Sequence, residues 1–268
     1  MTLSGQPVLK TQALTGSVSR REIVSKVSGE IFLGNWIGLI GANGSGKSTL
    51  LRMVSGLFLD SDMSSSGRVE TASGVELSTL GRLDRLRTVA YVGSSLETDF
   101  QLSVFEAVSM GIMGDGFFWT VSNEIRKKID EALNVFDLTD LQDRHLSTLS
   151  HGERQRVLLA RTWVIDPKVW ILDETFSQMD LQYQLRFGSI LRERVNRKEI
   201  AVVWVSHDLN LCLKFASLVW VLHQGRLIAA GEKSTTLTEA VFHEIYPGAQ
   251  VRVSLRKTNS HEAMWVEY

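Results

Sequence analysis

The segment from residue 37 to residue 50, IGLIGANGSGKSTL, constrains the fold of this chain more than any other. Its first residues include Ile37, Leu39 and Ile40, a short apolar run that predicts a buried parallel strand. A glycine-rich loop follows directly, and the sequence after it predicts a helix that ends near Gly56. This order of elements and the spacing G-x-x-x-x-G-K-[ST] are those of a phosphate-binding loop, or P-loop.

The residue types of this loop suit a phosphate group. Glycines let successive backbone N–H groups point inward, because no Cβ blocks the approach of an anion. The helix that begins at the loop adds its free N–H groups and the positive end of its dipole. Lys47, also a predicted catalytic residue, supplies a mobile charge for the outer phosphates, and the Ser48 hydroxyl suits Mg²⁺. The predicted nucleotide-binding residues here are Gly41, Asn43, Gly44, Ser45, Gly46, Lys47, Ser48 and Thr49. A turn that binds nothing is the alternative, and the strand–loop–helix context disfavours it.

Composition excludes several classes of protein. With 268 residues, 44% of them hydrophobic, the chain is long enough to bury a large core. It carries 29 Lys and Arg against 30 Asp and Glu, so its charge gives no case for nucleic acid as a partner. The single cysteine, Cys212, excludes an intramolecular disulfide and is expected to be a small buried hydrophobe. No apolar run reaches the ~18 residues of a membrane span, which leads us to expect a soluble, cytoplasmic protein.

The pattern of the chain predicts an α/β fold: a P-loop NTPase core with a mostly parallel sheet, an N-terminal antiparallel β subdomain and a helical subdomain. We expect one ATPase domain over residues 1–246, with the helical subdomain at about 95–165, and a C-terminal tail over 247–268. Residues 60–67 are polar and predict a loop. Short strands are predicted at 8–14, 27–33, 68–71, 75–77, 89–92, 169–172, 201–205, 218–222 and 226–229.

A second motif complements the P-loop. Residues 169–174, VWILDE, form an apolar strand that ends in two acids. A P-loop ATPase needs a carboxylate at the end of a parallel strand beside the P-loop to hold Mg²⁺, and Asp173 fits that role. Glu174 fits the role of the carboxylate that orients the attacking water or accepts its proton. An apolar strand ending in Asp-Glu is a weak signal alone, and its value comes from the P-loop upstream.

Two further motifs are ambiguous when each is taken singly. Residues 149–155, LSHGERQ, place Ser150 and Glu153 at the spacing of a capping box, so they indicate at least a helix start. A helix start next to Gly152 is also a possible anion site. His207 stands at a predicted strand end in VSHD, where a lone histidine is more often structural than catalytic.

Taken together, these motifs favour a functional interpretation over a purely structural one. The order P-loop, LSxGE, apolar run with Asp-Glu, and SHD resembles the nucleotide-binding subunit of ATP-binding cassette (ABC) transporters, over about residues 8–235. The resemblance implies a head-to-tail dimer that sandwiches two MgATP. Residues 41–49 of one copy would face Ser150, Gly152 and Glu153 of the other.

The resemblance also implies individual roles. Asp173 would be the magnesium-associated acid, Glu174 the catalytic base, and His207 the contact to the γ-phosphate. Residues 177–180, ending in Asp180, match the loop that crosses to the partner's site. The implied partners are a second copy and integral membrane permease subunits. The implied place is the cytoplasmic face of the inner membrane.

This sequence departs from the family pattern in three ways. Gly93 and Ser94 stand where a Pro-Gln pair is usual, and Ser94 is a possible, shorter-armed metal contact. The stretch 17–21 has no aromatic residue where the family stacks adenine. Thr175-Phe176 replaces the usual Pro-Thr after the catalytic glutamate, and His151 replaces a signature glycine.

Residues 99–111, DFQLSVFEAVSMG, resemble a family segment common in the ATPases of metal-chelate importers. The leading hypothesis is therefore an importer ATPase that powers a separate permease for a metal chelate such as a siderophore, haem or cobalamin. One alternative is an ATP-gated dimerising module with weak hydrolysis, which the missing glutamine favours. Others are an exporter ATPase, or an ABC protein acting on ribosomes or DNA, which the single set of motifs and the near-neutral charge disfavour.

Overall fold

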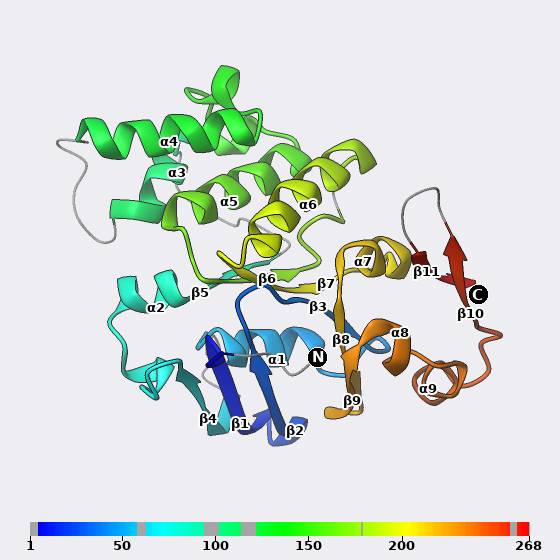
Figure 1. The fold of residues 1–268 in the computed structure, drawn as a ribbon. Coiled ribbons are helices and arrows are strands. Elements are labelled where there is room, and N and C mark those ends of the chain that lie inside the picture. Colours follow the sequence, from blue (N-terminus) through cyan, green and yellow to red (C-terminus); the bar gives the residue numbers. More distant parts are fainter. Residues whose placement is uncertain are drawn as a thin grey trace.

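The computed structural model describes residues 5–57, 63–93, 102–113, 122–177, 179–257 and 262–267. At its centre lies a six-stranded sheet in the order β5-β6-β7-β3-β8-β9 (Figure 1). Its strands are β3 (Trp36–Ile40), β5 (Val89–Val92), β6 (Val169–Asp173), β7 (Ala201–Val205), β8 (Leu218–His223) and β9 (Arg226–Glu232). The first five strands in spatial order pair in parallel, and β9 pairs antiparallel with β8. The predicted mostly parallel sheet is confirmed.

A small antiparallel sheet lies at the N-terminal side, in the order β2-β1-β4. It consists of β1 (Leu9–Val18), β2 (Arg21–Ile31) and β4 (Met63–Thr71). The predicted loop is wrong for residues 63–67, because they belong to β4, and residues 63–66 pair with β1, for example Ser64 with Ser17. Strand pairing uses backbone groups, so an exposed edge strand needs no apolar pattern. The strand predicted at 75–77 is also wrong: Glu76 forms one isolated bridge, and Leu77–Thr79 is a 3₁₀ turn.

Helix α1 (Lys47–Val54) follows the P-loop and lies between the two sheets (Figure 1). Its predicted end is confirmed. Gly56 has a positive φ of 69°, and its N–H and that of Leu57 bond to the carbonyls of Met53 and Arg52 at 3.0 and 2.9 Å. Glycine adopts this left-handed conformation without the steric penalty of a Cβ, which is why it ends the helix.

Four helices cover the other face of the central sheet (Figure 1). They are α3 (Val104–Met113), α4 (Asn123–Val135), α5 (His151–Ile165) and α6 (Leu181–Asn196), while α2 (Arg82–Thr88) leads into β5. Successive residues of β6 serve the two faces in turn: Trp170 and Leu172 pack with the helices, whereas Val169 and Ile171 pack toward α1. Burial on both faces explains why this strand is a continuous apolar run.

The C-terminal part of the chain packs against the opposite edge of the sheet from α2. It comprises α7 (Leu209–Phe215), α8 (Lys233–Thr236), α9 (Glu239–Ile245), β10 (Arg252–Lys257) and β11 (Glu262–Glu267). The side-chain amide of Asn210 donates to the carbonyl of Val266 at 3.1 Å and accepts from its N–H at 2.9 Å. The hairpin of β10 and β11 is thereby attached to the helix that follows His207. None of the helices in the described ranges has the length and apolar character to cross a membrane.

Candidate nucleotide site

Three strand ends bring the predicted site residues together. Strands β6, β7 and β3 are neighbours and parallel, so their carboxyl ends lie at one edge of the sheet. Strand β7 lies between the other two, so the strand that ends in Asp173 is one strand away from the strand that leads into the P-loop. A pocket of about 440 Å³ opens at this edge. Its lining includes Asn43, Lys47, Glu174, His207 and Tyr246.

The P-loop glycines are required by the space around them. A Cβ on Gly41 would overlap the carbonyl oxygen of Leu222 and lie 2.7 Å from the hydroxyl of Ser45. A Cβ on Gly46 would lie 2.7 Å from the carbonyl of Ile23, and its φ of 99° already disfavours any side chain. Gly44 also has a positive φ, 77°. Beyond the loop, Ser48 is exposed and Thr49 half-buried in the first turn of α1.

Lys47 curls back over its own loop. Its ammonium group donates to the carbonyls of Gly41 at 2.8 Å and Ala42 at 3.0 Å. Burial lowers the pKa of Lys47, while the nearby charges of Glu174 and Asp173 raise it. The lysine therefore lies within electrostatic reach of the acid pair, as the sequence predicted, and it points into the same pocket.

Asp173 is 5% exposed, and its two carboxylate oxygens differ. Oδ2 accepts a hydrogen bond of 2.7 Å from the hydroxyl of Tyr91. Oδ1 is buried and has no hydrogen-bond partner among the described residues. A buried acceptor of this kind is costly unless another group satisfies it. A hydrated Mg²⁺ is such a group, so the residues present fit the metal that the P-loop implies.

Tyr91 is a hydrogen-bond donor to that carboxylate at every physiological pH. Burial raises the pKa of Tyr91 to about 12, and the adjacent Asp173 contributes in the same direction. Arg52 also interacts with the Tyr91 side chain and opposes the shift in the pKa. Sequence analysis missed both residues. The contact depends on strand pairing, since Tyr91 pairs with Ile171 and side chains two residues apart, such as those of Ile171 and Asp173, share one face.

Glu174 adopts a backbone conformation that is uncommon for a non-glycine residue, with φ at 53°. Its N–H bonds to the carbonyl of Val205 at 3.0 Å, and its carbonyl accepts from the hydroxyl of Ser177 at 2.8 Å. The carboxylate then lies 2.8 Å from Nε2 of His207. The structure thus joins Glu174 and His207 into a pair, and both line the pocket together with Lys47, the third predicted catalytic residue.

The capping box at the start of α5 is confirmed. Ser150 Oγ accepts from the N–H of Glu153 at 3.3 Å, and the Glu153 carboxylate accepts from the N–H of Ser150 at 2.7 Å. These side-chain and backbone hydrogen bonds to Ser150 lower the pKa of Glu153. Neither residue lines the pocket that holds Lys47, and neither does Gly152. Asp180, exposed at the start of α6, is also outside it. Ser94 falls outside the described residues.

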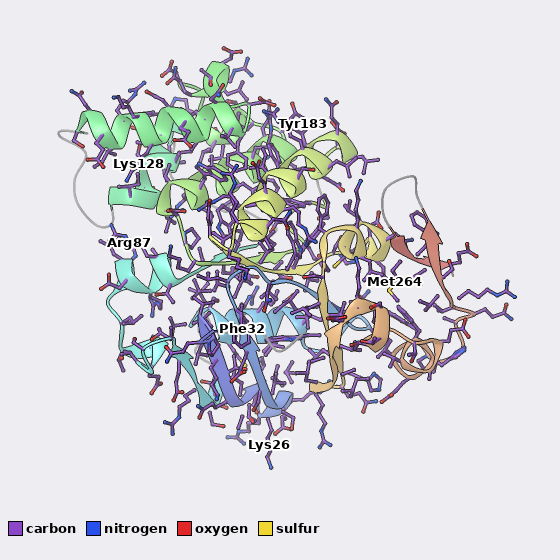
Figure 2. All side chains as sticks on the ribbon, in the orientation of Figure 1. Lys26, Phe32, Arg87, Lys128, Tyr183 and Met264 are labelled. Carbon is purple, nitrogen blue, oxygen red and sulfur yellow. The ribbon has the colours of Figure 1, made fainter. Side chains whose placement is uncertain are left out.

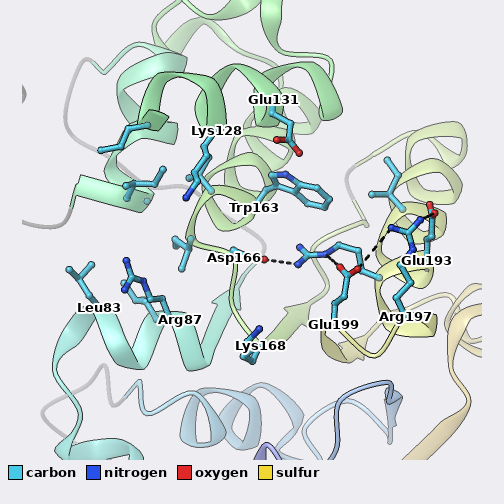
Figure 3. Close-up of a pocket in the computed structure, with 18 residues that line it drawn as sticks. Leu83, Arg87, Lys128, Glu131, Trp163, Asp166, Lys168, Glu193, Arg197 and Glu199 are labelled. Carbon is cyan, nitrogen blue, oxygen red and sulfur yellow. Dashed lines mark hydrogen bonds and ion pairs between the residues drawn. The ribbon is translucent and has the colours of Figure 1, made fainter. Parts of the chain in front are cut away.

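A larger groove, of about 730 Å³, lies at the amino ends of the strands (Figure 3). Its lining includes the apolar side chains of Ile112, Ile125 and Trp163. Around it lie several charged side chains, some of them paired, such as Arg194 with Asp166 at 2.6 Å and with Glu199 at 3.1 Å. Arg87 and Lys168 are exposed at the groove and form no ion pair among the described residues (Figure 3).

Comparison with known proteins identifies the family. The sequence profile described as ABC transporter matches residues 24–177. The chain belongs to the ABC transporter family. Its members' ATP-binding subunits are ATPases coupled to transport, so the predicted family and the predicted ATPase are both confirmed.

Three similar proteins illustrate the range within the family. The hemin import ATP-binding protein HmuV of Hydrogenovibrio crunogenus is 32% identical over 84% of this chain and 87% of that protein. A probable sulfate/thiosulfate import ATP-binding protein CysA of Chlorella vulgaris is 31% identical over 81% of this chain and 90% of that protein. An inward-facing metal-chelate type ABC transporter matches with a TM-score of 0.78 and 22% identity, over 98% of this chain and 97% of that one. That structural match confirms the α/β fold of this ABC subunit.

The packing of Gly41 generates the first prediction. Gly41→Ala forces a methyl group against the Leu222 carbonyl, and we expect it to lower the free energy of unfolding by about 1–3 kcal/mol. Urea denaturation followed by circular dichroism measures this. Gly81→Ala is the matched control, because a Cβ there has no atom within 4 Å. Equal stability of the two variants would contradict the close packing around Gly41.

Proposed function

We propose that two copies of this chain form a head-to-tail dimer that binds two MgATP and hydrolyses them to drive a separate membrane permease. One observation carries the proposal: the pocket of a single copy contains Lys47, Glu174 and His207 but not the capped helix start at Ser150. The capping box uses the N–H groups of Ser150 and Glu153, and it leaves those of His151 and Gly152 without an intrahelical acceptor. A phosphate held by residues 41–49 of one copy would complete these bonds in the other. In this arrangement Asp180 also faces the partner.

The chemistry is a displacement at the γ-phosphorus. Glu174 accepts a proton from a water molecule whose oxygen bonds to phosphorus, and the bond from phosphorus to the bridging oxygen breaks, giving ADP and phosphate. His207 is 2.8 Å from Glu174 and holds the carboxylate toward the pocket while its ring contacts the γ-phosphate. Lys47 exchanges the loop carbonyls for phosphate oxygens when nucleotide binds. Positioning and charge stabilisation supply most of the rate in such sites.

Ser48 and Asp173 would hold Mg²⁺, which neutralises charge on the β- and γ-phosphates. Oδ1 of Asp173, which is buried and has no hydrogen-bond partner among the described residues, supports this role. A possible contribution from Ser94 belongs to this proposal as well. ATP and Mg²⁺ are thus the proposed cofactors, and nucleic acid is not a proposed partner, since the net charge is −1.

Removing the base separates binding from hydrolysis. We expect Glu174→Gln to lower the rate of ATP hydrolysis by about 10²–10⁴-fold, because the amide cannot accept the proton of the attacking water. Lys47→Ala should weaken ATP binding itself, because it removes the mobile charge at the phosphates. Phosphate release and the affinity for a fluorescent ATP analogue are the measurements.

Glu244→Gln is the control for these variants, since Glu244 is exposed on α9. Full hydrolysis by Glu174→Gln would contradict the assigned base. Negligible phosphate release by the unaltered chain, even with its permease, would favour the alternative of an ATP-gated module with weak hydrolysis.

A mixing experiment tests the head-to-tail dimer. A Lys47→Ala chain lacks a working P-loop, and a Ser150→Arg chain blocks the helix start that faces the partner's P-loop. Each variant alone should hydrolyse ATP at a background rate. A mixture should recover activity, because each mixed dimer has one site with both halves intact. Failure to recover, with mixed dimers demonstrated by affinity tags, would place both halves of the site in one chain.

The groove in Figure 3 is the proposed contact for the permease. Apolar lining residues, together with two exposed cations that form no ion pair within the described ranges, suit a short amphipathic helix that carries an acidic residue. The groove is joined to the nucleotide pocket by β6, which begins just after Lys168 and ends at Asp173. A helix docked there would contact the strand that carries the metal-binding acid.

We further propose that the permease imports a metal chelate, since the similar HmuV protein is a hemin import ATP-binding protein and residues 99–111 match the segment described above. Residues 99–101 of that segment lie outside the described ranges. The similar CysA protein is named for sulfate, so the substrate depends on which permease binds.

We propose the ATPase domain as residues 1–246, with a helical subdomain at about 95–165, and residues 247–268 as a tail that packs on α7. We also propose that the subunit lies on the cytoplasmic face of the membrane.

Charge reversal in the groove tests the permease contact. Arg87→Glu or Lys168→Glu should reduce recovery of the co-expressed permease at least about tenfold, because like charges across an interface cost several kcal/mol. ATP affinity should not change. Lys26→Glu is the control, because Lys26 is exposed on β2, at the bottom of the view in Figure 2, away from Arg87. Undiminished recovery of the permease with both groove variants would exclude this surface. The identity of the recovered permease, with uptake of an iron chelate by vesicles that contain the complex, tests the substrate.

A further inference from the structure

The carboxylate of Asp173 is held from one side only. The Tyr91 hydroxyl lies 2.7 Å from Oδ2, while Oδ1 is buried without a partner among the described residues. A carboxylate can rotate about its last side-chain bond, which has a broad two-fold preference. A single strong hydrogen bond to one oxygen therefore decides where the other oxygen points.

Tyr91 is itself fixed at two places. Its ring packs with the apolar core between the central sheet and α1. Its oxygen interacts with the guanidinium of Arg52, which lies in the last turn of α1. Helix α1 begins at Lys47, so a chain of polar contacts runs from the end of the P-loop helix through Tyr91 to Asp173.

Strand geometry explains how Tyr91 reaches this acid. Tyr91 pairs with Ile171, and Asp173 is two residues further along the same strand and on the same face. Such a diagonal neighbour is too far for a small side chain but within reach of an aromatic one. A tyrosine is therefore well suited to this position, because its hydroxyl can donate to the carboxylate while its ring stays in the core.

We infer that Tyr91 is a positioning residue, whose hydroxyl holds Oδ2 of Asp173 so that Oδ1 faces the magnesium of bound MgATP. The inference rests on the proposed function, because it requires that Asp173 bind the metal. Tyr91 is not among the residues that line the nucleotide pocket. It acts through the carboxylate, in the way that outer hydrogen bonds orient the ligands of other metal sites.

Tyr91→Phe tests this with little change in packing, since it removes only the hydroxyl. The full-length chain is titrated with a fluorescent, non-hydrolysable ATP analogue, first in EDTA and then at increasing Mg²⁺. We expect affinity in EDTA to be unchanged and the Mg²⁺ concentration for half-maximal effect to rise about tenfold. Tyr183→Phe is the matched control, because Tyr183 lies on α6, away from β5 (Figure 2), and stacks on Phe187.

Asp173→Asn distinguishes a failure of the metal role of Asp173 from a failure of the positioning role of Tyr91. If Asp173→Asn leaves the Mg²⁺ dependence unchanged, the metal role of Asp173 in the proposed function is wrong. If Asp173→Asn weakens it and Tyr91→Phe does not, only the positioning role of Tyr91 is overturned. An equal loss of affinity with and without Mg²⁺ in Tyr91→Phe also overturns it, because the hydroxyl then acts on the fold in general.

Two further measurements complete the test. In the Asp173→Asn background Tyr91→Phe should have no additional effect on the Mg²⁺ dependence, and an additive effect would contradict the coupling. Should Tyr91→Phe fail to fold, as judged by circular dichroism, Arg52→Met provides the second variant. It loosens the other end of the chain of contacts and should shift the Mg²⁺ dependence in the same direction, and an unchanged dependence would count against the inference.

Discussion

The parallel pairing of β6 and β7 with β3 is the constraint on which the rest of this structure depends. Parallel strands end at the same edge of a sheet, so this pairing alone brings three distant segments together. The P-loop follows β3, the acid pair ends β6, and His207 follows β7. The pairing is held by burial of both faces, since Trp170 packs toward the helices and Ile171 toward α1. The pocket forms because the helices on one face of the sheet and α1 on the other hold these strands side by side.

The backbone at Glu174 shows how the fold maintains an unfavourable local geometry. A positive φ at a glutamate is costly and persists only where the surroundings impose it. Here the next two residues are both fixed. The hydroxyl of Thr175 donates to the carbonyl of Val92 at 2.7 Å, and Phe176 is buried edge-on against Trp204. These residues replace the usual Pro-Thr of the family. The Thr175 hydroxyl supplies a hydrogen bond that proline lacks, so this loop is tied to the end of β5.

The two hollows of the molecule lie at opposite ends of the same strands. The nucleotide pocket is at the carboxyl ends, and the groove is at the amino ends. Strand β6 joins them over five residues, from Val169 beside Lys168 to Asp173. Tyr91 adds a lateral link, because it ties β5 to the same acid. A permease segment in the groove and a nucleotide in the pocket would therefore act on one rigid, buried element, which is how packed elements carry coupling between sites.

The sequence by itself determined the local features, because each depends on residues close along the chain. The P-loop with its glycines, the end of α1 at Gly56, the capping box at Ser150 and the apolar strand before Asp173 all follow from short-range sterics, hydrogen bonding and periodicity. The order of the motifs also pointed correctly to the family. Only the tertiary structure decided that β7 separates β3 from β6, that residues 63–66 pair with β1, and that Tyr91 donates to Asp173 while it interacts with Arg52. These depend on which strands become neighbours, and that choice is made by burial of whole faces rather than by any local pattern.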